Sequence, residues 1–302
     1  QVTIHAFDIT YLPSTPIEND FLVGPAKIEL SILPGESKST EFTVINRVGE
    51  DRDFFLDFED FKGTRDISKP IEFIDRDSQE FLLSDFIFVE QRKFTLKHGE
   101  RIKIPITISI PPYADSDGLF ASVNVSSPSD ENISSGSNRS KAFIIPSISV
   151  LVFVDVLGDS VSLGELKSFG LKNGDTEWNG DHPVFRILFE NNGTKYLNPY
   201  GIIEIFDNDQ NLIDTIVVDP WYVLPDSLRT RDLEIKTPLQ VGNYSAKISL
   251  NRGYDNKVDE VVIEFSIISD NQNLLRAFLF IFFFIFCFVF AQRFLRRKNR
   301  LE

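Results

Sequence analysis

Four side chains with oxygen ligands lie close together in the second half of the chain and form the one candidate metal site of the sequence. They are Asp207, Asp209, Asn211 and Asp214. Such oxygens suit calcium, but an EF-hand loop starting at Asp207 needs Gly at position 212 and Glu at position 218, where this chain has Leu212 and Val218. A hairpin turn explains the same residues, because Asp and Asn side chains bond the backbone of turns. The sequence leaves both interpretations open.

Residues with catalytic potential are few and far apart. The histidines, His5, His98 and His182, lack the spacing of a helical zinc pair, and no HExxH motif occurs. The sequence also lacks a GxSxG elbow and the glycine loops that bind phosphates. Carboxylates are plentiful, so spacing alone leaves a glycosidase pair open. Because the other motifs are missing, the sequence predicts a protein that is not an enzyme and carries no cofactor.

Three aromatic residues lie in predicted loops and are candidates for contacts with a partner. They are Trp178 and the adjacent pair Trp221 and Tyr222. Tyrosine and tryptophan are enriched at binding surfaces, since each offers a large apolar ring with a polar tip. The alternative is that these rings cover the end of a folded core.

Alternating apolar residues predict strands in the first part of the chain. The clearest run is RIKIPITISI, in which Ile102, Ile104, Ile106, Ile108 and Ile110 fall on one face of a strand. Similar runs, separated by turn residues, extend from residue 26 to residue 157. Residues 63–90 interrupt the pattern with charges and turn signals, and we interpret them as an insertion. The prediction is an N-terminal β-sandwich over residues 1–158.

A second set of strand-length runs lies between residues 159 and 270. Asn-Gly and Pro-Asp turn signals separate the runs. About seven short strands at regular spacing are typical of an immunoglobulin-like sandwich. The predicted fold class is therefore all-β, with two tandem immunoglobulin-like β-sandwiches plus one C-terminal transmembrane helix.

The predicted transmembrane helix covers residues 273–292. About twenty apolar residues are enough to cross a bilayer as a helix. The side chains expected to contact lipid are Leu274, Phe278, Phe280, Phe282, Phe284, Phe286, Phe288 and Phe290. So many phenylalanines also suit an aromatic-packed partner helix. A buried core helix is the alternative, but such a helix is rarely apolar on every side.

The basic tail, 293–302, sets the predicted orientation, because basic residues stay on the cytoplasmic side of a membrane. They are Arg293, Arg296, Arg297, Lys298 and Arg300. The sequence thus predicts a single-pass protein of the plasma membrane with both sandwiches outside the cell. The chain begins at Gln1 and contains no Met, which favours a removed signal peptide. The lone cysteine, Cys287, lies within the predicted span, so we expect no disulfide in the sandwiches.

The predicted extracellular part is strongly acidic. The chain has 31 basic and 45 acidic residues. Six basic residues and one acidic residue fall in 273–302, which leaves a net charge of −19 for residues 1–272. Such a surface repels nucleic acid and anionic headgroups. The expected partners are membrane lipid, through the span, and another surface or membrane protein, with no nucleic acid.

In the first domain, LPGES is followed by STEFTVINR and later by LKHGERIKIPITISIPP and DGLFASVNV. The second domain contains FENNGTKYLNPYGIIEIFDNDQNLI and VLPDSLRTRDLEI. These motifs resemble those of the WxL-interacting proteins, surface proteins of Gram-positive-type bacteria. The insertion at 63–90, and LFAS where the family has paired glycines, depart from the pattern. The resemblance implies a surface adhesion or scaffold protein whose first domain meets peptidoglycan and whose second domain meets protein ligands.

The predicted function is therefore a non-enzymatic, membrane-anchored binding or adhesion protein that links the membrane to the cell wall or to a surface protein. One alternative is a structural subunit of a larger envelope assembly, docked through its sandwiches and its Phe-rich helix. Another is an accessory or chaperone-like module for an exported protein. Glycosylation stays open at the Asn-x-Ser/Thr sites, which are Asn124, Asn132, Asn138, Asn192 and Asn243. Oligomeric state stays open as well.

Overall fold

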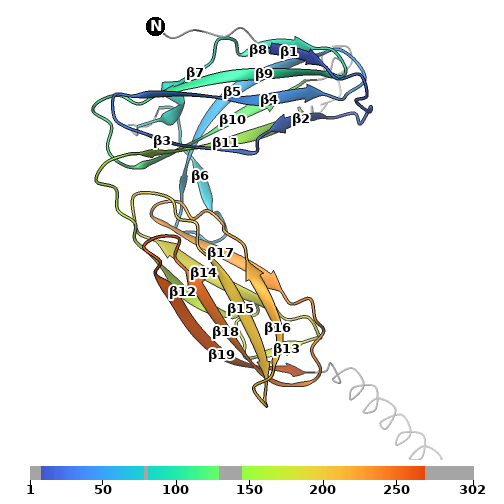
Figure 1. The fold of residues 1–302 in the computed structure, drawn as a ribbon, viewed down its shortest axis with the longest axis vertical. Coiled ribbons are helices and arrows are strands. Elements are labelled where there is room, and N and C mark those ends of the chain that lie inside the picture. The colour runs from blue at the N-terminus through green and yellow to red at the C-terminus, as the bar shows by residue number, and fades with distance from the viewer. Residues whose placement is uncertain (1–7, 78–80, 129–144, 269–302) are drawn as a thin grey trace, which may run out of the picture.

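Two β-sandwiches, joined at an angle, make up the part of the chain that the structure describes (Figure 1). The computed structural model describes residues 8–77, 81–128 and 145–268. The prediction of an all-β fold with two sandwiches is confirmed for these ranges. The predicted span and basic tail lie outside them, as do Asn132 and Asn138. Within the described ranges, no helix is long and apolar enough to cross a membrane.

The first sandwich contains the strands β1 to β11. One sheet has the order β1–β9–β4–β2, with β7 also on β9; the other has the order β3–β11–β10–β5–β6, with β8 also on β5. The strands of the first sheet are β1 (Asp8–Tyr11), β2 (Phe21–Gly24), β4 (Ser37–Asn46), β7 (Ile87–Phe88) and β9 (Glu100–Ser109). Those of the second sheet are β3 (Lys27–Ile32), β5 (Arg52–Gly63), β6 (Ile71–Phe73), β8 (Lys93–Leu96), β10 (Gly118–Ser126) and β11 (Ser147–Val156).

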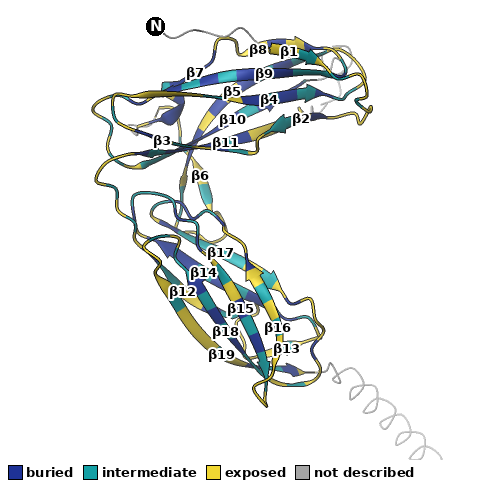
Figure 2. Ribbon diagram, in the orientation of Figure 1, coloured by how far each residue is buried: buried dark blue, intermediate teal, exposed yellow. Residues whose placement is uncertain are grey.

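The isoleucine stripe of β9 lies in the core of this sandwich, as predicted. Ile102, Ile104, Ile106 and Ile108 are fully buried, and Ile110 is 2% exposed. The colour changes between dark and lighter along the strands in Figure 2, because side chains alternate between the buried and the exposed face of a strand. Large apolar side chains that point inward therefore hold the two sheets together without a disulfide.

The chain passes from one sheet to the other between β2 and β3. β2 pairs with β4 in the first sheet, and β3 pairs in parallel with β11 in the second. The peptide bond between Gly24 and Pro25, at the crossing point, is cis. Because β3 pairs only with Leu151–Val156, the first four residues of β11 have no strand of the described chain on that side.

The second sandwich contains a three-stranded sheet, β12–β14–β17, and a five-stranded sheet, β13–β19–β18–β15–β16. The strands are β12 (Gly164–Leu171), β13 (Glu177–Asn179), β14 (Val184–Asn191), β15 (Tyr200–Asp207), β16 (Leu212–Val218), β17 (Ser227–Glu234), β18 (Gly242–Asn251) and β19 (Val258–Ile268). Its core holds Phe185, Phe189 and Ile203, which are fully buried. The architecture is immunoglobulin-like, with the sheets packed face to face.

Each sandwich contains an asparagine clamp, which is a buried asparagine at the end of one strand whose side chain makes three hydrogen bonds to backbone groups. In the first, Asn46 at the end of β4 donates from Nδ2 to the carbonyls of Glu50 and Leu96, both at 2.8 Å, and its Oδ1 accepts from the amide of Val48. In the second, Asn191 at the end of β14 makes the same three bonds, with Lys195, Val223 and Gly193 as partners. Each asparagine is fully buried. Each therefore fixes two loops at its end of a sandwich.

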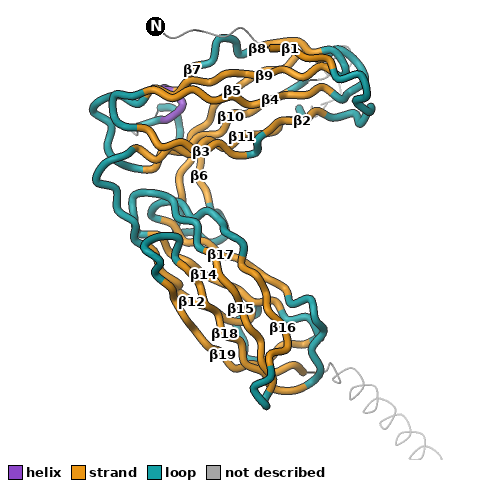
Figure 3. The backbone as a smooth tube through the Cα atoms, in the orientation of Figure 1, coloured by secondary structure: helices purple, strands orange, loops and turns teal. Residues whose placement is uncertain are grey.

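The segment set apart as an insertion, 63–90, has two structural roles. It contains β6, which continues β5 as a hairpin toward the second sandwich (Figure 1). It also contains the 3₁₀ helix η1 (Leu83–Phe86), the one helix among the described residues (Figure 3). η1 closes one end of the first core, where Asp60 accepts hydrogen bonds from the amide of Ser84.

Candidate functional site: a joint and a strand groove

An aromatic cluster joins the two sandwiches. Phe61, Phe120 and Phe153 lie on the outer face of the second sheet of the first sandwich, and Leu224 covers them from the second sandwich. The ring of Phe153 meets the rings of Tyr196 and Tyr222 edge-on, with centroids 5.1 Å apart in each pair. Edge-to-face contacts of this kind add to the gain from burying the rings. The cluster therefore forms a small apolar core between the sandwiches.

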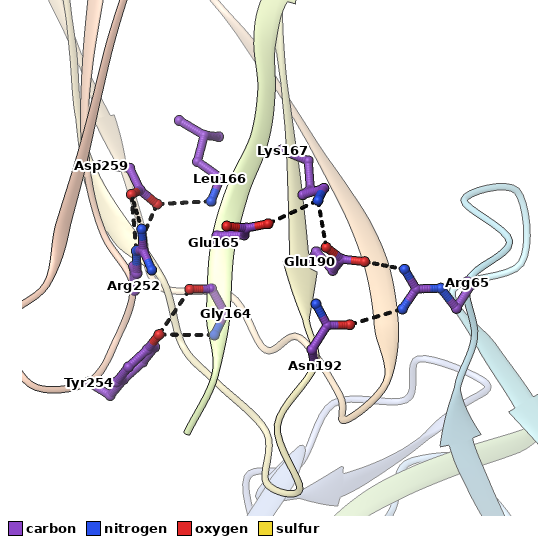
Figure 4. Close-up of polar contacts among 10 residues, drawn as sticks. All are labelled: Arg65, Gly164, Glu165, Leu166, Lys167, Glu190, Asn192, Arg252, Tyr254 and Asp259. Atoms are coloured by element: carbon purple, nitrogen blue, oxygen red, sulfur yellow. Dashed lines mark hydrogen bonds and ion pairs between the residues drawn. The ribbon is translucent and has the colours of Figure 1, made fainter. Parts of the chain in front are cut away.

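The hairpin between β5 and β6 supplies the polar part of the joint (Figure 4). Arg65, between these strands, forms ion pairs with Glu190 of β14 and with Asp226, and donates to Asn192 at 3.1 Å. Lys167 of β12 forms a second ion pair with Glu190, at 2.9 Å. Hydrogen bonds from Lys167 and Arg65 lower the pKa of the Glu190 carboxyl to about 2. The two cations therefore keep this carboxylate charged although it is almost wholly buried.

Backbone contacts bring the two sandwiches close together at the joint. The amide of Gly118 donates to the carbonyl of Thr194 at 2.8 Å, and the amide of Leu228 donates to the carbonyl of Thr64 at 3.0 Å. Gly63 lies so close to the second sandwich that a Cβ there would be 2.7 Å from the Cβ of Ser227. Glycine is thus required at this position, and the first sandwich is held to the second by apolar, ionic and backbone contacts together.

A second polar cluster holds the first strand of the second sandwich (Figure 4). The Tyr254 hydroxyl bonds both the amide and the carbonyl of Gly164 at 3.0 Å. Asp259 accepts from the amide of Leu166 at 2.9 Å and forms an ion pair with Arg252. These contacts fix the start of β12, which carries Lys167 toward the joint.

A groove of about 500 Å³ lies beside the gap between β2 and the start of β11. Phe21 and Leu22 of β2 line one side and Ile148 of β11 lines the other. Leu22 is 42% exposed and Ile148 is 36% exposed. Apolar side chains from both strands are therefore open to solvent where no strand of the described chain covers them.

The groove also lies along an uncovered strand edge and contains one buried donor without a hydrogen-bond partner. The amide of Leu151 donates toward β3, to the carbonyl of Ala26, so the main-chain groups of Ser147 and Ser149 point to the same side, where β3 is absent. The Nε atom of Arg52, a residue that lines the groove, is buried and has no hydrogen-bond partner. An extended peptide could satisfy both, because its backbone carries donors and acceptors at strand spacing.

The edge strands of the second sandwich, unlike β11 at the groove, carry charged side chains that point inward. Arg231 of β17 pairs with the core residue Ile187, so it points inward at the edge of its sheet. Asp214 of β16 also points inward, and its oxygens accept from the amides of Thr215 and Thr237. Inward-pointing charges on edge strands oppose the addition of another strand. The groove of the first sandwich is therefore the better place for strand addition.

The three aromatic residues predicted to contact a partner have different places. Trp221 is only 5% exposed and packs edge-on against Phe189, which agrees with the alternative that its ring covers the end of a folded core. Its ring turns inward because the link between β16 and β17 covers the end of the core. Trp178 lies in β13 rather than in a loop, and its ring is partly buried against the same core. Tyr222 belongs to the joint, where Arg229 lies 4.0 Å above its ring.

The candidate calcium residues form a hairpin turn. Asp207 accepts from the amides of Asp209 and Asn211 at 2.9 and 2.8 Å, and from the Asn211 side chain at 3.0 Å. These bonds lower the pKa of the Asp207 carboxyl, the Asn211 side chain contributing most. The Asp214 carboxylate accepts from the amide of Thr215, its neighbour on β16, and from the amide of Thr237, which follows β17. Among the residues that the structure describes, no group of His, Cys, Asp or Glu side chains is arranged to hold a metal ion.

The sequons that the structure describes also differ in position. Asn124 lies within β10 and bonds the carboxylate of Glu59, while Asn192 lies at the joint. Asn243 lies in β18, where its Oδ1 accepts from the Ser266 hydroxyl.

The sequence did not indicate the role of Arg65 at the joint, because a charged turn does not show which distant carboxylates its side chains meet. A sequence pattern does mark the asparagine clamps: an Asn at the end of a strand, with Gly two or three residues later, occurs in both halves of the chain.

The strand arrangement has distant counterparts among solved structures. The class 5 fimbriae chaperone CfaA aligns with 12% identity over 82% of this chain and 100% of that chain, with a TM-score of 0.39. The E. coli chaperone DraB aligns with 13% identity over 80% of this chain and 97% of that chain, with a TM-score of 0.38. The ASH/PapD-like domain of human CEP192 aligns with 12% identity over 52% of this chain and 97% of that chain, with a TM-score of 0.33. No family model and no curated protein matches the chain. The likeness is one of fold: two β-sandwiches of PapD-like and immunoglobulin-like type.

Proposed function

We propose that this chain is a non-enzymatic, membrane-anchored surface protein that binds an extended segment of another protein in the groove between β2 and β11. The observation that carries the proposal is the combination, in one groove, of an uncovered strand edge, apolar walls and a buried guanidinium nitrogen without a partner. Each of these three features fits a bound strand. Together they describe a missing neighbour of β11.

The bound segment completes the sandwich. Its backbone pairs with Ser147 and Ser149, and its inward side chains cover Ile148 and Phe21. A carbonyl of the segment accepts from the Nε of Arg52 once this side chain turns toward the groove, which removes the cost of leaving that donor buried and unpaired. The segment therefore has apolar residues at alternate positions. A strongly anionic segment is disfavoured, because the sandwiches carry a large negative charge.

The anchor is the sequence that follows β19. β19 ends at Ile268, at the end of the second sandwich away from the joint (Figure 1). The apolar run from residue 273 and the basic residues after it support a span with the sandwiches outside the cell. The joint then holds the first sandwich, with its groove, away from the membrane. The proposed partner is a protein of the cell surface, with peptidoglycan as a further contact of the first domain, as the resemblance to WxL-interacting proteins implies.

The test is a photo-crosslinker at position 148 of the full-length chain, in its own membranes. Position 9 is the matched control, since Ile9 is also an exposed isoleucine, on the edge strand β1 of the same sandwich. The proposal expects position 148, and not position 9, to attach to one extended segment of a surface protein, identified by mass spectrometry. Crosslinks to lipid or glycan alone, or equal labelling from both positions, would contradict it. Resistance of the chain to carbonate extraction checks the anchor separately.

A further inference from the structure

A polar basin of about 500 Å³ lies on the outer face of the five-stranded sheet, at the end of the second sandwich away from the joint (Figure 1). Its floor consists of two pairs of residues that face each other across β18 and β19: Asn243 with Ser266, and Ser245 with Glu264. Phe265, between two of these residues, is 2% exposed and points into the core. The side chains of the floor therefore point outward.

The basin contains donors and acceptors that the fold itself does not use. The turn after β15 forms one wall. Within the described ranges, four lining side chains make no hydrogen bond or ion pair; they are Asn208, Gln210, Ser245 and Glu264. The Nδ2 of Asn243 is a further donor, since the Ser266 hydroxyl engages only its Oδ1. Amide, hydroxyl and carboxylate groups are thus available side by side.

The backbone at Gln210 indicates that its side chain has a use. Its φ is 64°, in the left-handed region, where Gly or Asn costs less than Gln. The turn is held by bonds from the amides of Asp209 and Asn211 to Asp207, and these need no particular side chain at position 210. Residues in such a conformation cluster at ligand sites. Here the glutamine brings an amide to the wall of the basin.

The chemistry of the basin favours a neutral ligand with several hydroxyls. Calcium needs about six to eight oxygen ligands, and Glu264 is the one carboxylate of the floor, while turn amides engage Asp207. Glu264 and the negative charge of the chain repel an anion. An apolar ligand would leave the amides and the hydroxyl unpaired. A ligand hydroxyl suits all these groups, because it both donates and accepts.

Phe206 adds an apolar surface beside the polar floor. It faces Ser245 in register and is half-buried, while Ile205 before it points into the core. The ring of Phe206 therefore lies on the same outer face as the floor. A sugar ring has a face of C–H groups, which packs against an aromatic ring, and a rim of hydroxyls. The phenylalanine and the polar floor together suit a sugar better than a linear polyol.

We propose that this basin binds a neutral carbohydrate. Gln210 and Glu264 hydrogen-bond the ring hydroxyls, and Phe206 lies against the C–H face. The basin and the groove between β2 and β11 lie on different sandwiches and take different ligands. This site therefore does not depend on the proposed function, and either can fail without the other.

Saturation-transfer difference NMR tests the site in the full-length chain, held in a detergent without sugar headgroups and with EDTA present. The probes are neutral hexoses, N-acetylhexosamines and their short oligomers, with sorbitol as a linear control. Saturable transfer to the ring protons of at least one sugar is expected, and much weaker transfer to sorbitol. Transfer to none of the sugars, equal transfer to sorbitol, or transfer that appears only with added calcium would overturn the proposal.

Two glycine variants show whether the sugar lies in the basin. Gln210→Gly removes the amide and suits the left-handed backbone, so the fold is kept while the dissociation constant rises several-fold. Asn256→Gly is the matched control, because Asn256 has a φ of 51° in the turn between β18 and β19, at the other end of these strands. It should leave the constant unchanged. Equal constants in the two variants would overturn the proposal.

A third variant tests the floor of the basin. Glu264→Ala removes an exposed carboxylate that bonds nothing else in the described chain, so the unfolding midpoint should stay within a few degrees of the parent. The dissociation constant of the sugar is expected to rise several-fold. Unchanged binding would place the sugar outside the basin and overturn the assignment, even if Gln210→Gly weakens it.

Discussion

Arg65 and Glu190 form an ion pair across the joint although 125 positions separate them in the sequence. Arg65 lies in the hairpin between β5 and β6 of the first sandwich, and Glu190 lies in β14 of the second. Glu190 also binds Lys167, so the pair belongs to a network that spans both sandwiches. The angle between the sandwiches is therefore set by side chains of both.

Arg65→Ala is expected to loosen the joint while leaving both sandwiches folded. The substitution removes the ion pairs to Glu190 and Asp226, but Lys167 still neutralises Glu190. The distance between labels at positions 9 and 262 should broaden in a pulsed EPR measurement. Arg65→Lys keeps the positive charge but loses the planar guanidinium with its several donors, and it should broaden the distance distribution less. An unchanged distribution would show that the aromatic cluster alone fixes the angle.

Acid should weaken the joint through Glu190. The pKa of this carboxyl is about 2 in the folded chain, below its usual value of 4.5. A depressed pKa contributes stability above the unfolded pKa, and that contribution is lost as the pH falls from about 4.5 through 2. The midpoint of urea unfolding should therefore fall over this window. Glu190→Gln should show a shallower fall; an equal slope in both proteins would assign the acid effect to other groups.

Trp221→Ala is expected to destabilise the second sandwich by about 3–5 kcal/mol, because it leaves a cavity at a buried ring. Trp221→Phe should cost much less, since the ring contact with Phe189 is kept and the lost Nε1 donor has no partner. Chemical unfolding followed by circular dichroism measures both. If the alanine variant is as stable as the parent chain, Trp221 does not cover the core as described.

Asn191→Asp is expected to damage the second sandwich although it changes one atom. The acceptor for the amide of Gly193 remains, but two buried donations to the carbonyls of Lys195 and Val223 are lost. Each unpaired buried group costs about 1–3 kcal/mol. Asn46→Asp is the internal counterpart and should act on the first sandwich by a similar amount. Separate unfolding transitions of the two variants, followed by hydrogen exchange, would reveal whether the clamps are equivalent.

The sequence predicts strands well where apolar residues alternate with polar ones. The isoleucines of β9 alternate, and an alternating strand against a partner sheet has one buried face. The direction of a loop aromatic follows no such rule, which is why the sequence leaves both a partner contact and a place over the core open for Trp221. The groove could not be predicted either, because it depends on where β3 stops pairing with β11. That endpoint is a property of the sheet register, and no local residue pattern marks it.

The register of β19 also determines how the chain resists force. β19 pairs with β18 along the whole run from Gly242–Ile267 to Asn251–Val258, and its C-terminal end pairs with β13 in parallel. A pull on Ile268 along the strand loads these hydrogen bonds in shear, so many must break together rather than one after another. β19 is therefore placed to carry tension between a partner bound by the sandwiches and an attachment that follows Ile268.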